Sequence, residues 1–240
     1  MFADGTFYIA PIFSYQVFIT RVYASEINSF YTTSLFILNN KEQITYELLF
    51  EELKKNESKY NNNIIVTPKI LHCDFEKSIS NASIKIFHNI TIKYCVWHYK
   101  RSLEVQKNKL CYNEVENNHK IYLFYKAITN FPFINPEYIF DIYNYIKIIC
   151  QIYNYFNFLN FLEYFNKTYL YKYDIQYWNY YNDINHITNN ASEFFSNYLK
   201  KLFYKKPSFY ELIYHLKREE SLSYYNYKRK IEGVWKKNEY

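Results

Sequence analysis

The hydrophobic and polar positions of the first sixty residues predict a run of strands followed by a helix. Runs of β-branched and aromatic residues, bounded by polar turns, indicate strands at Ser14–Val22 and Thr33–Leu38. The opening residues Met1–Phe7 extend this pattern, which suggests an antiparallel meander. The segment Thr45–Lys55 has an apolar stripe with charges opposite, so we expect a helix capped by Thr45.

The segment Pro68–His98 has the pattern around which the rest of the chain is organised. An apolar run ends just before Asp74, and the apolar residues of Ser78–Phe87 are spaced with a loosely helical period. Ile90–Tyr94 is a second apolar run. This order predicts strand, helix and strand. Asp74 then lies just beyond the carboxyl end of a buried strand, where open α/β sheets hold ligands and catalytic groups.

Beyond His98 the spacing of apolar residues becomes helical, so the chain is a mixed α/β protein with a helical half. The most apolar part, Ile148–Leu162, is interrupted by polar residues, which favours a buried helix over a membrane span. We expect Tyr224–Tyr240 to be weakly ordered. The predicted helices are Trp97–Leu110, Lys120–Thr129, Pro136–Tyr145, Ile146–Phe165, Asn189–Tyr204 and Ser208–Lys217.

Composition changes this interpretation in two ways. The 240 residues include 31 Tyr and 21 Phe but 2 Gly, a bias typical of A/T-rich codons, so counts of aromatics carry little weight. With so little glycine, turns rely on asparagine pairs such as Asn117–Asn118, and Asp4 with Gly5 also signals a turn. The four cysteines form no tight framework, which indicates a reduced, intracellular protein.

The net charge of +6 and the isoelectric point near 8.8 permit an anionic partner such as nucleic acid but do not require one. Basic residues cluster at Lys100–Arg101, at Lys200–Lys201 and near the C-terminal end. Any one cluster alone is more typical of a solvated helix face.

Six short motifs, taken in order, resemble those of MULE (Mutator-like element) transposase domains, and they span nearly the whole chain. No single motif is specific, but each lies on the type of element expected. They are ADGTF at Ala3–Phe7, TYELLFEELKK at Thr45–Lys55, CDFEKS at Cys73–Ser78, CVWH at Cys95–His98, TNNASEFF at Thr188–Phe195 and KPSFYELIYHLKREE at Lys206–Glu220.

This resemblance implies an RNase H-like fold with a mixed five-stranded sheet flanked by helices. It also implies an all-helical insertion before the last catalytic helix. The expected organisation is a core at 1–110, the helical insertion at 111–187, C-terminal helices completing the core at 188–223, and a weakly ordered tail at 224–240.

The resemblance further implies a DDE site of Asp4, Asp74 and Glu193, which cleaves DNA and transfers strands. Phosphodiester cleavage needs an activated oxygen nucleophile and a stabilised leaving oxygen. Two Mg²⁺ (or Mn²⁺) ions about 3.5–4 Å apart meet both needs, and carboxylates are the oxygen ligands that suit them. The expected partner is DNA, both the transposon ends and the target. A homo-oligomer is compatible with this function, and neither a membrane nor a small-molecule substrate is expected. The expected location is nuclear.

Each acid also has a structural interpretation. Asp4 before Gly5 is a common turn pair, and Asp74 can cap the following helix. The apolar stripe expected for the last catalytic helix, through Phe195, Tyr198, Leu199 and Leu202, leaves Glu193 facing away from it. Glu76 is either an auxiliary acid or, more simply, a residue that favours the helix start through the dipole.

The resemblance makes Cys95 and His98 the Cys-x-x-His signature of the family, near the active site. His98 then positions a phosphate or a water, or else is a satisfied histidine at a strand-to-helix corner. A zinc site with Cys111 and His119 is disfavoured, because helical structure between the two pairs separates the ligands.

Two further groups of residues are candidates for contacting DNA. Lys100, Arg101, Lys200 and Lys201 are candidates for binding its phosphates. For the tryptophans, core packing is preferred over stacking on bases at both Trp97 and Trp178.

Two features of the sequence depart from the family pattern. Only Met1–Ala3 precede Asp4, whereas a first strand of about five residues is typical before that acid. No Cys/His-rich module of the kind that accompanies family members is found in the sequence. The alternative function is therefore a truncated or domesticated transposase remnant, catalytically inactive and at most DNA-binding.

Overall fold

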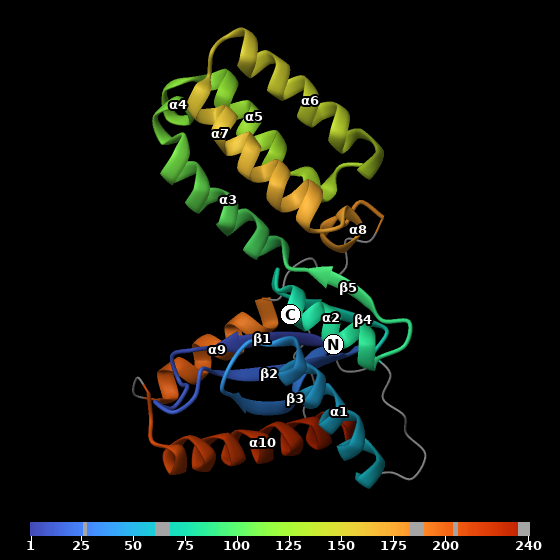
Figure 1. The fold of residues 1–240 in the computed structure, drawn as a ribbon. Coiled ribbons are helices and arrows are strands. Elements are labelled where there is room, and N and C mark those ends of the chain that lie inside the picture. Colours follow the sequence, from blue (N-terminus) through green and yellow to red (C-terminus); the bar gives the residue numbers. More distant parts are fainter. Residues whose placement is uncertain (26–27, 61–67, 183–189, 204–205, 235–240) are drawn as a thin grey trace. The chain divides into compact units, whose positions relative to one another are not determined.

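The computed structural model describes residues 1–25, 28–60, 68–182, 190–203 and 206–234 (Figure 1). Of residues 56–60 and 190–194 it describes the backbone only. The chain divides into two compact units, the first formed by 1–92 and 189–240 and the second by 93–188. Within the described ranges, no helix combines the length and the hydrophobicity needed to cross a bilayer.

A five-stranded mixed sheet forms the centre of the first unit, as predicted. Its strand order is β3-β2-β1-β4-β5. β1 pairs with β2 and β2 with β3 in antiparallel orientation, whereas β1 and β4 are parallel. The strands are β1 (Phe2–Thr6), β2 (Gln16–Ala24), β3 (Ser29–Leu38), β4 (Ile70–Cys73) and β5 (Thr91–Tyr94).

Helices α1 (Gln43–Tyr60) and α2 (Lys77–Ile86) pack against each other and cover one face of this sheet. The rings of Phe18 and Tyr46 are 5.2 Å apart, which joins β2 to α1. The start of α1 corrects a prediction: Thr45 lies inside the helix, and Asn40 organises its entry. The Asn40 side-chain oxygen accepts hydrogen bonds from the Glu42 amide and the Thr45 hydroxyl.

The other face of the sheet is covered by α9 (Asn190–Leu202) and α10 (Phe209–Ile231). Its core joins apolar residues of β2, the loop before it and both helices: Ile9, Ala10, Val17, Ile19, Leu199, Phe203, Leu212 and Leu216. α10 extends far beyond Lys217, where the sequence predicted its end, and takes in part of the segment expected to be weakly ordered. Ser208 caps its start, because the hydroxyl accepts a hydrogen bond from the Glu211 amide at 3.3 Å.

The second unit is helical. α3 packs against α4, α5 and α7 and belongs to this unit, which begins at residue 93. A short 3₁₀ turn (Phe131–Phe133) and a π-helix (Asn166–Lys172) complete the path. The α-helices are α3 (Val96–Leu110), α4 (Tyr112–Asn117), α5 (His119–Thr129), α6 (Pro136–Ile152), α7 (Phe156–Phe165) and α8 (Ile175–Trp178).

Asparagines set the helix boundaries of this unit. Asn118 caps α5 and Asn135 caps α6, each by accepting backbone N–H groups. Asn154 adopts φ 55° and separates α6 from α7. The predicted break at Tyr145/Ile146 is therefore wrong, because the left-handed conformation that ends α6 falls on an asparagine further along the chain.

Aromatic side chains fill the core of the second unit. Trp178 is fully buried, its ring is stacked on Tyr99 with centroids 5.5 Å apart, and its indole N–H donates to the Tyr169 carbonyl at 3.1 Å. The prediction of core packing is confirmed for Trp178. It is wrong for Trp97, which is 36% exposed.

The buried tyrosines make the fold sensitive to alkaline pH. Burial raises the pKa of Tyr143 to about 12 and also raises the pKa values of Tyr99 and Tyr169 well above the usual tyrosine value. The unfolded chain ionises these groups near pH 10. Their contribution to stability is therefore complete below about pH 10 and falls as pH rises above it. We expect the last part of the tyrosinate absorbance, which comes from the buried tyrosines, to appear together with the loss of the helical circular dichroism signal in a pH titration. Full ionisation with the helices intact would contradict this.

Candidate active site

Asp4 lies inside a strand, so its interpretation as a turn residue is wrong. It pairs with Ile19 of β2 and is 8% exposed. β1 is five residues long and has a hydrogen-bonded neighbour on each side, β2 and β4. The few residues before Asp4 thus suffice for a strand, and a central strand is a rigid support for a functional carboxylate.

Asp74 follows the neighbouring strand at the level of Asp4. Phe2 and His72 are register partners on the parallel strands β1 and β4, and their rings stack at 4.5 Å. Side chains repeat every second residue on one face of a sheet. Two residues further on, Asp4 is still in β1 and Asp74 directly follows the end of β4 at Cys73, so the register places Asp74 near the level of Asp4.

The turn after Asp74 is fixed by backbone and side-chain contacts. Helix α2 begins with Glu76, not Asp74, at its N-cap position, so the interpretation of Asp74 as the cap is wrong. The Glu76 amide donates to the Asp74 carbonyl at 2.7 Å. The Asp74 side-chain atom Oδ1 is buried.

Glu76 is part of a polar network that joins α1, α2 and β2. Its carboxylate pairs with the Lys41 ammonium at 2.6 Å and accepts the Tyr46 hydroxyl at 2.8 Å. The Gln16 side-chain amide in turn donates to the Tyr46 oxygen at 2.8 Å. Gly5 leaves space for this glutamine, because a β-carbon there would lie 2.2 Å from Gln16 Oε1. The glycine after Asp4 therefore serves close packing rather than a turn.

We predict that Tyr46→Phe lowers the free energy of unfolding by about 1–2 kcal/mol, since it leaves buried partners of one hydroxyl unsatisfied. Urea unfolding followed by circular dichroism measures this. Tyr15→Phe is the matched control, because Tyr15 is 50% exposed, and its stability should stay within about 0.5 kcal/mol of the parent protein. Equal effects of the two substitutions would contradict a structural role for the network.

Helix α9 brings a third element to Asp4. The Ser196 hydroxyl is buried and donates to Asp4 Oδ2 at 3.3 Å. The buried stripe of α9 passes through Ser196 and Leu199 and continues to Phe203, just after the helix. Tyr198, which the sequence pattern placed in this stripe, is 37% exposed. The position of Glu193 is one helical turn before Ser196. The Glu193 side chain is outside the part of the chain that the structure describes.

The four basic residues predicted to contact DNA are all exposed, two in each unit. Lys200 and Lys201 lie in the last turn of α9, and the Lys200 ammonium donates to the Asn197 side chain at 3.3 Å. Lys100 and Arg101 lie in α3 and line a pocket of about 480 Å³. The same pocket is lined by Trp97 and by Lys126 of α5, and the Arg101 guanidinium lies 4.9 Å from the Trp97 ring centre.

Cys95 and His98 belong to the second unit at the start of α3. Cys95 is buried at the N-cap position, and the His98 ring packs edge-on against Trp97 at 4.7 Å. Within the described residues, no three His, Cys, Asp or Glu side chains cluster as a metal site would require. All four cysteines are buried thiols, and burial raises the pKa of Cys111 to about 12. A thiol with that pKa is a poor ligand or nucleophile.

Three residues of these sites were not found from the sequence. Ser196 has an ordinary helical context, and its contact spans 192 residues, so no local pattern signals it. Tyr46 is one of 31 tyrosines. Lys126 meets Lys100 and Arg101 only because α5 packs on α3. The one available signal was Gly5. Glycine is rare in this chain, so its presence indicates a position of close packing.

Comparison with known proteins gives one match. The family model of the MULE transposase domain matches residues 1–102. This range contains Asp4, Asp74, Cys95 and His98 but not Glu193, and it is shorter than the resemblance found in the sequence. Neither the curated proteins nor the solved structures contain a match to the chain.

Proposed function

We propose that this chain is a DDE-type transposase catalytic domain that performs metal-dependent DNA strand cleavage and strand transfer in Mutator-like transposition. The observation that carries the proposal is that Asp4 lies in β1 and Asp74 directly follows the parallel neighbouring strand β4, with α9 hydrogen-bonded to Asp4 through Ser196. The family match over residues 1–102 supports a transposase-related function and interaction with DNA. In this proposal the sheet is an RNase H-like core, and the helical segment 93–188 is an insertion into it.

The residues at this site fit a pair of Mg²⁺ or Mn²⁺ ions. Asp4 offers a hard oxygen ligand from β1, and Asp74 offers one from the position directly after the neighbouring strand β4. Glu193, one turn before Ser196, is the proposed third ligand. When bound, the ions activate the attacking oxygen and stabilise the leaving oxygen of the phosphodiester.

The chain's own residues hold these ligands in place. Ser196 orients one oxygen of Asp4, and the strands on both sides of β1 fix its backbone. The Glu76 amide holds the carbonyl of Asp74, while Lys41 and Tyr46 hold Glu76. Such preorganisation matters because a site about 1 Å too loose loses much of its rate enhancement.

DNA in this proposal is bound through phosphate contacts of Lys100, Arg101, Lys200 and Lys201, which are all exposed. Binding is then largely independent of sequence and weakens with salt. We also propose a nuclear location and a homo-oligomer, because transposition acts on two ends of chromosomal DNA. The role of Cys95 and His98 in this proposal is to support the site, with His98 positioning a phosphate or water.

The inactive-remnant alternative is not favoured. Its main motivation was a first strand too short to hold Asp4, and β1 has five residues with Asp4 at its centre. The acid is buried and hydrogen-bonded rather than exposed in a frayed end.

Metal removal tests the proposal. The full chain is expected to nick supercoiled plasmid DNA with Mg²⁺ or Mn²⁺ and to lose this activity in EDTA. The Asp141→Asn protein is the matched control, because Asp141 is an exposed acid of α6, and it should nick as the parent does. Nicking that persists unchanged in EDTA would contradict a metal-dependent mechanism.

A further inference from the structure

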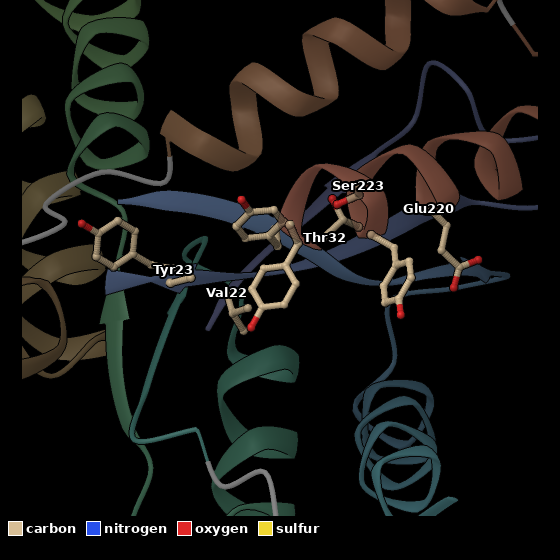
Figure 2. A pocket seen from close by; sticks show the side chains of 9 residues that line it. Val22, Tyr23, Thr32, Glu220 and Ser223 are labelled. Carbon is tan, nitrogen blue, oxygen red and sulfur yellow. The ribbon is translucent and has the colours of Figure 1, made fainter. Parts of the chain in front are cut away.

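A groove of about 480 Å³ lies between the edge of the sheet and the C-terminal half of α10 (Figure 2). Four tyrosines line it, Tyr23 and Tyr31 from β2 and β3 and Tyr224 and Tyr227 from α10. The volume is within the range of about 300–1,000 Å³ that ligand sites occupy. None of the acids or basic residues of the proposed catalytic function lines this groove.

The tyrosines present accessible aromatic surface and one unsatisfied polar group. The Tyr31 and Tyr227 rings meet nearly perpendicular, with centres 5.1 Å apart, and Tyr224 is 54% exposed. The Tyr31 hydroxyl is buried and has no hydrogen-bond partner among the described residues. Leaving such a group unpaired is costly, so a ligand with a polar edge is favoured over a purely apolar one.

Two lysines of α10, which are not among the residues that line the groove, lie close to two of its aromatic rings. The Lys230 ammonium lies 5.9 Å from the Tyr31 ring centre and the Lys228 ammonium 5.4 Å from that of Tyr224. Arg229 lies between them in sequence, in the exposed last turn of α10, and Glu220 is the charged residue among those that line the groove. The lysines repel a cationic ligand and attract an anionic one. Flat rings next to cations are the combination that binds single-stranded nucleic acid.

We infer that the groove binds unpaired nucleotides of a single DNA strand. Bases stack on the exposed ring of Tyr224 and reach the Tyr31 hydroxyl with a polar edge, while phosphates contact Lys228 and Lys230. This inference rests on the proposed function for its choice of DNA. It adds a surface that holds a strand beside the catalytic acids.

The position of the groove suits this role. Tyr23 is four residues beyond Ile19, the register partner of Asp4, which corresponds to about 13 Å along β2. Both lie in the first unit, so the same DNA strand can reach the groove and the acids within a few nucleotides. A strand separated at the cleavage point is thereby kept from re-pairing.

Fluorescence anisotropy of the full chain in EDTA tests the inference with a labelled oligothymidine and a duplex of equal length. Tyr224→Ala is expected to weaken single-strand binding about tenfold or more and to leave duplex binding unchanged. Tyr210→Ala is the matched control, because Tyr210 is on the same helix, is 85% exposed and does not line the groove. Lys230→Gln is expected to lower the salt dependence of single-strand binding by about one phosphate contact.

Two outcomes overturn the inference: Tyr224→Ala without effect, or an equal loss in Tyr210→Ala. If the Tyr224→Ala protein fails to fold, Tyr31→Phe and Lys230→Gln replace it, and strand binding unchanged in both overturns the inference.

Because these assays contain no metal, they separate the groove from the nuclease. The Asp74→Asn protein should bind the strand as the parent does. If the strand binds with the expected pattern but no nicking occurs, the inference on the groove is supported and the proposed nuclease function is contradicted. If nicking occurs without strand binding, only the inference on the groove is contradicted.

Discussion

Replacing Asp74 by asparagine is expected to reduce Mg²⁺-dependent nicking of plasmid DNA by about a thousandfold or more. The substitution keeps the size of the side chain but removes the negative charge that holds a divalent ion. The charge stabilisation supplied by a bound ion is several kcal/mol, and each 1.36 kcal/mol corresponds to tenfold in rate. The rate of nicking at saturating DNA, measured on agarose gels, gives the result.

Two control measurements make this prediction specific. The thermal midpoint of the Asp74→Asn protein should match that of the parent to within a few degrees, which excludes unfolding as the cause. The Asp141→Asn protein should retain full activity, since Asp141 is exposed on α6. Equal nicking by Asp74→Asn and by the parent protein would show that the site assignment is wrong.

Trp178→Ala is expected to cause the largest loss of stability, about 3–5 kcal/mol. The indole is fully buried, is stacked on Tyr99 and donates a hydrogen bond to the Tyr169 carbonyl. Its removal leaves a cavity and an unsatisfied carbonyl in the core of the second unit. The melting midpoint measured by circular dichroism should fall by about 10 °C.

Trp97→Ala provides the comparison for this substitution. Trp97→Ala removes the same side chain from a position that is 36% exposed, so the melting midpoint of this protein should fall by much less than that of Trp178→Ala. A similar fall for both proteins would mean that the Trp178 contacts are not a main source of stability.

Local pattern predicted most elements of the first unit because its strands and helices bury one regular face. The segment 68–98 gave strand, helix and strand within a few residues of their positions in the structure. Boundaries set by contacts distant in sequence were not predictable. Asp4 looked like a turn residue because Asp-Gly favours turns, but pairing with β2 and β4 keeps it in a strand.

The candidate site was predictable only in part, for a similar reason. Asp74 was found from its place after an apolar run. The orientation of α9 was misjudged because Ser196, a polar residue, occupies the buried stripe where it meets Asp4. A stripe counted from apolar residues alone therefore shifted towards Tyr198. Buried polar residues that serve a site break hydrophobic periodicity, and they do so where function is expected.

The same limit applies to the second unit. Its helix caps followed from asparagine and proline, as at Asn135 and Pro136. The break between α6 and α7 depended on the positive φ of Asn154, one of many asparagines in a chain with 2 Gly. Nothing in the local sequence distinguishes that asparagine from its neighbours, so the packing of α7 decides the position.

A crystal structure of the full chain grown with Mn²⁺ and DNA tests the central claim most directly, because anomalous scattering locates the metal independently of activity. Our account predicts anomalous peaks within ligand distance of the carboxylates of Asp4 and Asp74, with Glu193 completing the set. Mn²⁺ bound only elsewhere, or the Asp4 and Asp74 carboxylates directed away from each other, would contradict it.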